Sequence, residues 1–547
     1  MERFRSRVFV FGRKVLQAAL PARLRARFAP ERGAGGAPVS PPAPSWWLTR
    51  FLILRLLGFV YLSAFLSLAL EVRPLLGHDG LVPADLCLER LAQSAGSRWA
   101  GPWRHPTLFW IASSDGALVG LAWLGTALSL VVACGFANAI LLAALWAVYL
   151  SFVKVGPGFL DYGFDLLLAE TGFLAIFLCP LLDARPFPRL PPPAPVLWLL
   201  RWLLLRLLLG AGLIKLRRDP CWRDLSCLDT YFETQPLPNP LSAAFHFLPS
   251  WVHRPGVLFS HFVELVASWL VLAPRTLRRA AGAIQLLFQV LLILSGSLGF
   301  LNWLTAVPIL ACFDDALLAR ILPRRLVLRA ERAAAEARAC RGQTIAVSLL
   351  VALVLVLGLA PVRNLLSPGQ RMNASFDRLA LVNSYGAFAK VARERAEIVF
   401  EGTDEVEIGA DTAWREYELP CKPGDVRRRP CWIAPLWPRL DLRFWYAAKS
   451  EPGQHLWTLH FAWKLLHGDR GTLELLAGDP FPEQPPRYVR ARLYRYSFAP
   501  RGNPTGVVWR RELLREWLPP VALDDARLRR VLAASGWLRP GPARGPR

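Results

Sequence analysis

Ionisable side chains stand inside some of the most apolar stretches of this chain, where a charge is costly unless it is paired or does chemistry. Asp165 and Glu170 share one such stretch. They are five residues apart, about 140° around a helix, so they do not form one paired-carboxylate site. His261 and Glu264, three residues apart in a later stretch, are predicted to share a helix face.

Basic side chains lie in the stretch between these two. Arg201 and Arg206 lie within it and Lys215 ends it. One interpretation is structural ion pairing between neighbouring helices, for instance Glu170 with Arg206. The other is a proton path or a membrane-embedded catalytic base. At this stage both remain open.

Known catalytic patterns are absent from the sequence. It contains no GxSxG elbow, Walker loop, HExxH, GxGxxG or CxxC. His246, His253 and His261 lack companions at a zinc-ligand spacing. We therefore expect no metal, no cofactor and no enzymatic activity.

The composition indicates a membrane protein. Of 547 residues, 54% are hydrophobic and only 19% are charged, against about 25% charged in soluble domains. The net charge of +24 is spread between and beside apolar blocks and forms no basic domain with interleaved aromatics. The sequence therefore predicts contact with a lipid bilayer and no nucleic-acid partner.

Apolar blocks able to cross about 30 Å of hydrocarbon follow one another from residue 51 to residue 361. The shortest of them can be re-entrant, so we predict about six to nine spans. The blocks are Phe51–Leu70, Ala117–Cys134, Phe136–Val153, Phe164–Leu182, Val196–Ile214, Val257–Ala273, Ala283–Leu298, Phe300–Phe313 and Thr344–Pro361.

The loop charges predict the orientation, because cytoplasmic loops collect Lys and Arg. A basic tail, residues 1–50, is predicted to be cytoplasmic, and the arginine-rich loop 314–343 falls on the same side. Loops 71–116 and 215–256 then lie outside. So does everything after residue 361.

Residues 362–547 differ from the rest of the chain. Apolar and polar residues alternate at 397–401, 414–419 and 488–498, which is typical of half-buried strands. An amphipathic helix is predicted at Leu456–Leu466. The predicted fold is thus a multi-pass α-helical membrane region followed by a mostly β extracytoplasmic domain.

The cysteines on the outer side fall into close pairs. Cys221 with Cys227 and Cys421 with Cys431 are the natural candidates for disulfides on an oxidising side; free buried thiols are the alternative. Asn373 begins an Asn-Ala-Ser glycosylation sequon in the same outer region.

Long strings in matching order resemble the lipase maturation factor family over nearly the whole chain from Trp46. They lie at Leu167–Leu181, Leu209–Asp229, Phe232–Ser242, Phe300–Ala316, Val382–Phe388, Pro420–Cys431, Arg439–Ala448 and Tyr488–Phe498.

The resemblance implies a multi-pass protein of the endoplasmic reticulum membrane. Family members help secreted lipases, such as lipoprotein lipase, to fold and assemble into active dimers, and they have no established catalytic residues. An immature lipase or another exported protein is the implied partner. The basic tail has no family counterpart, and a bacterial member would place the outer domain in the periplasm.

Two alternatives remain. A membrane-embedded enzyme using Glu170, Lys215, His261 or Glu264 would remotely resemble vitamin-K-dependent carboxylase. A transporter is disfavoured, because no inverted repeat is visible. For a maturation factor, aromatic side chains of the loop 215–256 and of the final domain are the candidate client contacts: Trp222, Tyr231, Phe232, Phe245, Trp251, Trp437, Trp445 and Trp457.

Overall fold

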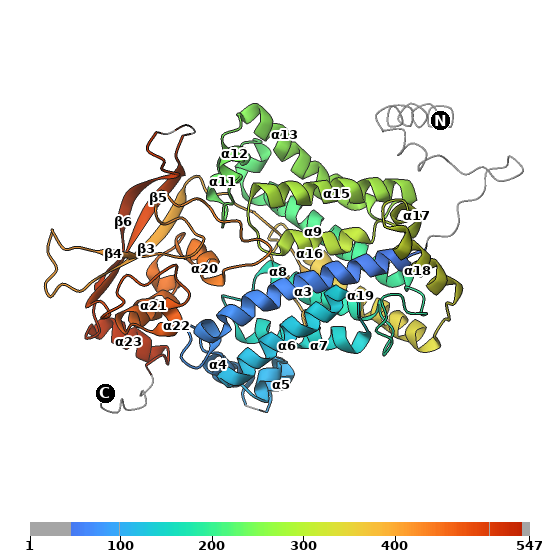
Figure 1. Ribbon diagram of the computed structural model, residues 1–547, viewed down its shortest axis with the longest axis horizontal. Helices are drawn as coiled ribbons and strands as arrows, with labels where there is room; N and C mark the ends of the chain where they lie inside the picture. The colour runs from blue at the N-terminus through green and yellow to red at the C-terminus, as the bar shows by residue number, and fades with distance from the viewer. Residues whose placement is uncertain (1–44, 98, 501, 503, 539–547) are drawn as a thin grey trace, which may run out of the picture.

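The computed structural model describes residues 45–97, 99–500, 502 and 504–538. Residues 1–44 of the predicted basic tail lie outside these described residues. Long helices lie side by side in one half of the molecule, and a twisted sheet with its own helices lies at one end of them (Figure 1). The helix α3, Trp47–Leu76, runs through the middle of the helical half.

The helical half is built from apolar helices joined by short loops. Five are long and apolar enough to cross a membrane: α3, α6 (Asp115–Cys134), α9 (Ala194–Arg218), α15 (Arg275–Ser295) and α19 (Arg341–Leu366). Shorter helices pack among them: α7 (Ala139–Val155), α8 (Gly163–Ile176) and α16 (Leu301–Leu310).

The block predicted at Val257–Ala273 is an interrupted helix. It consists of α13 (Ser250–His261), a π-helical segment (Phe262–Ala267) and α14 (Ser268–Leu270). The predicted class, a multi-pass helical region followed by a β-containing domain, is confirmed. The helix ends reach into both predicted outer loops, since α3 continues to Leu76 and α9 to Arg218.

The two ends of the helical half are chemically different. At the end near α17 (Asp315–Leu318) and α18 (Arg324–Ala335) (Figure 1), Asp314 pairs with Arg279 and, at 2.7 Å, with Arg275. Next to it, Asp315 accepts the backbone N–H groups of Trp47 and Leu48 at 2.7 and 2.9 Å, which caps the start of α3. The other end carries the sheet domain.

The sheet domain contains one antiparallel sheet in the order β4-β3-β5-β6. Its strands are β3 (Arg395–Thr403), β4 (Arg415–Tyr417), β5 (Tyr488–Phe498) and β6 (Trp509–Val521). The three predicted strand segments overlap β3, β4 and β5, whereas β6 was not predicted.

Helices cover one face of this sheet. They are α20 (Arg439–Ala447), α21 (Trp457–Leu466) and α23 (Ala526–Ala534). Phe400 of β3 packs edge to face against Phe444 and Phe461, with ring centroids 5.6 and 5.0 Å apart. Packing of this kind gives the domain its own apolar core.

The chain between α19 and the sheet enters the helical half. Two short paired strands, β1 (Ala374–Ser375) and β2 (Asn383–Ser384), lead to a turn that meets α9 at Gly210. A Cβ on Gly210 would lie 2.5 Å from the Tyr385 carbonyl oxygen, so only glycine allows this approach. The final third of the chain therefore contacts the ends of the helices and also inserts a turn between them.

Candidate functional site

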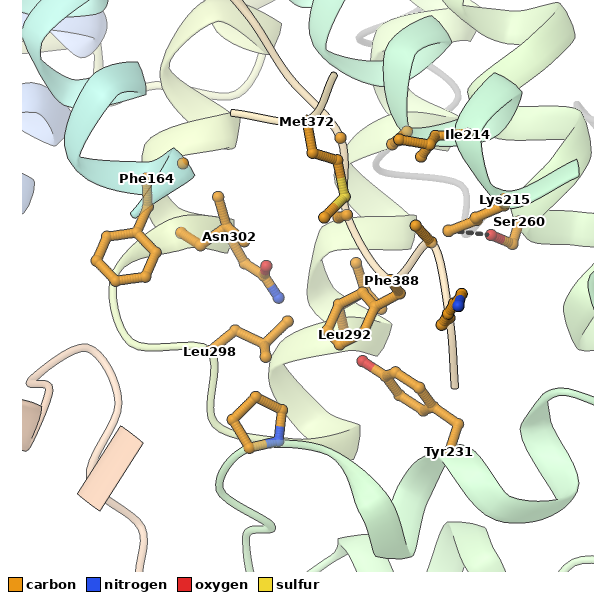
Figure 2. Close-up of a pocket in the computed structure, with 18 of the residues that line it drawn as sticks. Phe164, Ile214, Lys215, Tyr231, Ser260, Leu292, Leu298, Asn302, Met372 and Phe388 are labelled. Carbon is orange, nitrogen blue, oxygen red and sulfur yellow. Dashed lines mark hydrogen bonds between the residues drawn. The ribbon is translucent and has the colours of Figure 1, made fainter. Parts of the chain in front are cut away.

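A large cavity lies where the helices, the loop after α9 and the sheet domain meet. Its volume is about 1190 Å³, at or above the upper end of ordinary small-molecule pockets. Apolar side chains from several elements face one another across it in Figure 2, among them Phe164, Leu292, Leu298 and Phe388. The cavity is therefore mainly apolar, with a few polar groups in its wall.

One buried ion pair forms part of that wall. The Lys215 ammonium of α9 lies 2.6 and 2.8 Å from the two Glu264 carboxylate oxygens and 3.2 Å from the Ser260 hydroxyl. It also lies 4.6 Å from the centre of the Trp222 ring. Lys215 and Glu264 are each only 4% exposed. Such a pair resists breaking, because removing one partner strands the other charge.

Glu264 belongs to the π-helical segment Phe262–Ala267. Widened turns of this kind occur often at functional sites. His261, at the preceding turn, donates from Nε2 to the Trp222 carbonyl oxygen at 2.9 Å. That His261 and Glu264 share a helix face stays a prediction. Both lie near Trp222, His261 through this hydrogen bond and Glu264 through its partner Lys215.

A second polar group lines the cavity from the sheet domain. Arg443, Lys449, Ser450 and His455 all belong to its wall. The Ser450 hydroxyl lies 2.6 Å from His455 Nε2, and the Lys449 ammonium lies 3.0 Å from the centre of the Trp445 ring. Burial lowers the pKa of Lys449 to about 7, with nearby Arg395 acting in the same direction.

Glu170 of α8 does not line the cavity but lies in a polar cluster next to it, of which Tyr385 belongs to the cavity wall. It pairs with Arg206 of α9, and its other oxygen accepts the Asn383 N–H at 2.9 Å and the Tyr385 hydroxyl at 2.7 Å. Arg206 also donates to the Asn383 carbonyl oxygen at 2.6 Å. We call Glu170, Arg206, Asn383 and Tyr385 the Glu170 junction. It fastens the inserted turn to two helices.

Asp165, one and a half turns earlier in α8, serves a related purpose. It accepts the Tyr149 hydroxyl at 2.5 Å and the Tyr162 N–H at 3.1 Å, which caps α8. Arg439 of the sheet domain lies 3.8 Å away and donates to the Phe159 carbonyl oxygen at 2.8 Å. Asp165 therefore helps to hold the sheet domain at the end of the helices.

Arg201 is satisfied differently. Its guanidinium donates to the Ala311 carbonyl oxygen at 2.8 Å and lies 4.8 and 4.9 Å from the ring centres of Trp46 and Trp198. It belongs to helix packing and not to the cavity.

Both close cysteine pairs are joined as disulfides, Cys221 with Cys227 and Cys421 with Cys431. The second is held by Asp441, which accepts the N–H groups of Cys421 and Lys422 at 2.8 and 2.6 Å. Burial raises the pKa of Asp441 to about 6, against the effect of these two bonds.

The loop after α9 and the sheet domain form one unit. Arg395 donates to the carbonyl oxygens of Glu233, Gln235 and Pro236 at 2.8, 2.5 and 3.0 Å. The Trp445 indole donates to the Thr234 carbonyl oxygen at 3.0 Å. We call residues 219–249 and 391–538 together the outer module, after the side of the membrane that the sequence predicts for them; both disulfides belong to it.

Most aromatic candidates for client contact are packed inside the molecule. Exposure falls to 5% or less for four of them: Trp222, Tyr231, Trp437 and Trp457. Trp251, by contrast, is 75% exposed. Asn373 lines the cavity and accepts the Gly386 N–H at 3.3 Å, so use of its sequon stays a prediction.

Sequence reasoning missed Asn383 and Tyr385, which complete the Glu170 junction. Their string, residues 382–388, stood out only through its resemblance to the family. A polar Asn-Ser-Tyr run between apolar residues gives no signal of insertion, since its partners lie about two hundred residues away along the chain. The described residues contain no cluster of His, Cys, Asp and Glu able to hold a metal ion.

Together these features define a class of protein, a polytopic helical membrane protein in which the helices and the outer module enclose a large apolar cavity. Residues 48–320 match the family model of the lipase maturation factor transmembrane domain, and residues 381–519 match that of the lipase maturation factor C-terminal domain. The chain belongs to the lipase maturation factor family.

Similar proteins cover nearly the whole chain. Lipase maturation factor 1 of Bos taurus is 43% identical over 93% of this chain and 95% of its own length. Lipase maturation factor 1 of Homo sapiens is 41% identical over 94% of both chains. Lipase maturation factor 2 of Homo sapiens is 31% identical over 91% of this chain and 86% of its own. No solved structure matches.

Proposed function

We propose that this protein is a membrane-resident maturation factor that helps secreted lipases, such as lipoprotein lipase, to fold and assemble. One observation carries the proposal. The chain matches proteins named lipase maturation factor 1 at 41–43% identity over more than nine tenths of its length, through both domains in the same order. Function is often shared at this level of full-length similarity.

The two disulfides support an oxidising location for the outer module. Disulfides persist in the lumen of the endoplasmic reticulum or in the periplasm and are rare in the cytosol. The arginine-rich loop 314–343, with α18 (Arg324–Ala335), lies at the opposite end of the helices. A topology with the outer module in the lumen and α18 in the cytoplasm therefore agrees with both the two disulfides and the positive-inside rule. We place the protein in the endoplasmic reticulum membrane.

Client contact is assigned to the exposed face of the outer module. Trp432 follows Cys431 directly and is 53% exposed, whereas Trp437, in the same loop, is 2% exposed. An exposed indole beside a disulfide gives a large contact area that is held rigidly. The protein acts in this proposal by binding, without a catalytic step.

Rescue of lipase activity tests the function. Cells that lack their own lipase maturation factors would express lipoprotein lipase with or without this chain, and secreted activity would be divided by secreted lipase mass. The proposal predicts that the chain restores activity per mass. Trp432→Ala should reduce the rescue while the protein level stays normal, with the exposed Leu523→Ala as its matched control. Inactive lipase in the presence of well-expressed chain would contradict the function.

A membrane-embedded enzyme is the second candidate, and one observation favours it. Lys215, Glu264 and Ser260 meet beside a π-helical segment on the wall of this cavity. An enzyme would lose all activity on Lys215→Met while remaining folded. A maturation factor that acts by binding should keep most of its lipase rescue when Lys215 and Glu264 are replaced together by Met and Leu.

A further inference from the structure

The cavity has the two-part character of a site for an amphiphile. Its helical wall is hydrocarbon-like, with Leu208, Phe288, Leu292 and Leu301 among its members. Basic side chains also line the cavity, from the C-terminal end of α9, from the segment between α19 and the sheet, and from the outer module. They are Arg218, Arg371, Lys390, Arg443 and Lys449.

These basic side chains have no acidic partner in the described part of the chain. None of the five forms an ion pair with a described carboxylate. Of the two acidic residues in the wall, Asp161 and Glu264, the second is already neutralised by Lys215 at 2.6 Å. The cavity therefore offers positive charge beside an apolar volume.

Unpaired hydrogen-bonding atoms point to the same ligand chemistry. Arg443 Nε, His455 Nδ1 and Trp437 Nε1 are buried and have no hydrogen-bond partner among the described residues, and all three residues line the cavity. Two of these atoms can only donate, and His455 Nδ1 donates when it carries the proton. Buried donors without acceptors are costly, and a ligand rich in oxygen acceptors would satisfy them.

The cavity also reaches the lipid-facing surface of the helices. Leu291 lines it and is 37% exposed. It lies on α15, a helix apolar enough to cross a membrane, whose neighbouring residues Leu287 and Val290 are 52% and 49% exposed. Entry of a lipid from the bilayer would pass Leu291 on this face of α15.

We propose that this cavity binds an anionic phospholipid from the surrounding bilayer, with its acyl chains among α9, α15 and α16 and its headgroup against Arg443 and Lys449. Apolar area holds the chains, and the basic rim selects the charge. The site lies beneath the outer module, so bound lipid would brace the module against the helices. The inference does not depend on the client and goes beyond the maturation role.

Photocrosslinking in nanodiscs tests this proposal on the full-length protein. Phosphatidylglycerol and phosphatidylcholine probes would each carry a diazirine in the acyl chain, and the labelled residues would be mapped by mass spectrometry. We expect labels on Leu292, Leu298 and Phe388, with phosphatidylglycerol preferred. Arg443→Gln or Lys449→Gln should each lower the phosphatidylglycerol labelling about fivefold, the equivalent of about 1 kcal/mol per charge. The exposed Arg510→Gln is the matched control and should change nothing.

A cavity-filling pair keeps the test independent of the charge variants. Leu298→Trp should abolish labelling inside the cavity with both probes. Val290→Trp, on the exposed face of α15, should leave that labelling unchanged. Thermal melting of each variant would establish that it is folded. Equal labelling by the two probes, or labels confined to the outer face of α15, would overturn the proposal. So would displacement by an apolar peptide or by free oleate at concentrations where added phosphatidylglycerol has no effect. Because no lipase is present, failure here leaves the maturation role untouched.

Discussion

The Glu170 junction and the Lys215–Glu264 pair contain the same chemistry in different surroundings. Each joins a carboxylate to a cation of α9 within the helical half, and each is nearly excluded from solvent. The Glu170 carboxylate is also held by Asn383 and Tyr385, so donors from three residues satisfy it; of the four junction residues, Tyr385 alone lines the cavity. The Lys215–Glu264 pair instead borders a cavity of about 1190 Å³.

The difference teaches that a buried charge in a membrane helix cannot be assigned a role from its residue type. A carboxylate that accepts hydrogen bonds from several distant segments has a structural role, because it holds those segments together. One that has a single cation and open space beside it remains available to a ligand. The comparison predicts unequal costs when each pair is altered.

Removing the Glu170 carboxylate should have the largest effect. Glu170→Ala strands the Arg206 guanidinium and frees the inserted turn, at a cost of about 3–5 kcal/mol for a broken buried pair. Thermal unfolding of the purified protein in nanodiscs would measure it. Glu394→Ala, in a surface pair with Arg495, is the control and should cost about 0–1 kcal/mol. Equal melting of the two variants would refute the fastening role.

Replacing both members of each pair should separate the sites. Lys215→Met with Glu264→Leu should restore nearly normal stability, because apolar groups of similar size often substitute for an isolated buried pair. Arg206→Met with Glu170→Leu should remain destabilised by about 1–3 kcal/mol, since Asn383 and Tyr385 lose their acceptor. Double-mutant cycles by thermal melting would compare the two. Full recovery of thermal stability in the Arg206→Met, Glu170→Leu double variant would show that the two ion pairs do not differ in their structural role.

The smallest expected effect is a pH dependence at the cavity rim. The pKa of Lys449 lies near 7 against an ordinary value of 10.5, mainly through burial, with Arg395 lowering it further and Glu397 opposing. Because the pKa of Lys449 is lower in the folded protein than in the unfolded chain, its protonation favours unfolding. The loss of folding stability is full below about pH 7 and disappears as the pH rises toward 10.5.

Two measurements check this titration. Amine-reactive labelling of Lys449 should rise through a midpoint near pH 7. Phosphatidylglycerol crosslinking should weaken between pH 6 and pH 8, and Lys449→Met should remove that dependence. A midpoint above pH 9 would show that the Lys449 amine is fully solvated, and would contradict its place in the cavity wall.

Periodicity and length were enough to predict much of the fold. The blocks Ala117–Cys134 and Val196–Ile214 lie within α6 and α9, because a helix that crosses the hydrocarbon core needs about 20 mainly apolar residues. Strand β5 coincides with the alternating segment Tyr488–Phe498. Strand β6 escaped prediction because its Leu513-Leu514 and Pro519-Pro520 pairs break the alternation and count against a strand.

The site itself could be predicted only in part. The sequence marked Glu170, Arg206, Lys215 and Glu264 as costly charges in apolar surroundings. It could not show that two of them meet an inserted turn and two border a cavity, because both arrangements depend on contacts made over long stretches of chain. The π-helical segment likewise has no local signature, since Phe262–Ala267 reads as an ordinary apolar helix.

Cysteine accessibility in sealed microsomes tests the central claim, an outer module on the oxidising side. Free thiols on the cytosolic surface would first be blocked with a membrane-impermeant maleimide. The vesicles would then be treated with an impermeant reductant and a mass tag, once with the membrane intact and once after detergent has opened it. The account predicts that Cys421 and Cys431 are tagged only after detergent opens the membrane. Cys340, exposed and free at the opposite end of the helices, should be blocked in intact vesicles. Reduction of Cys421 and Cys431 from the cytosolic side without detergent would contradict the account.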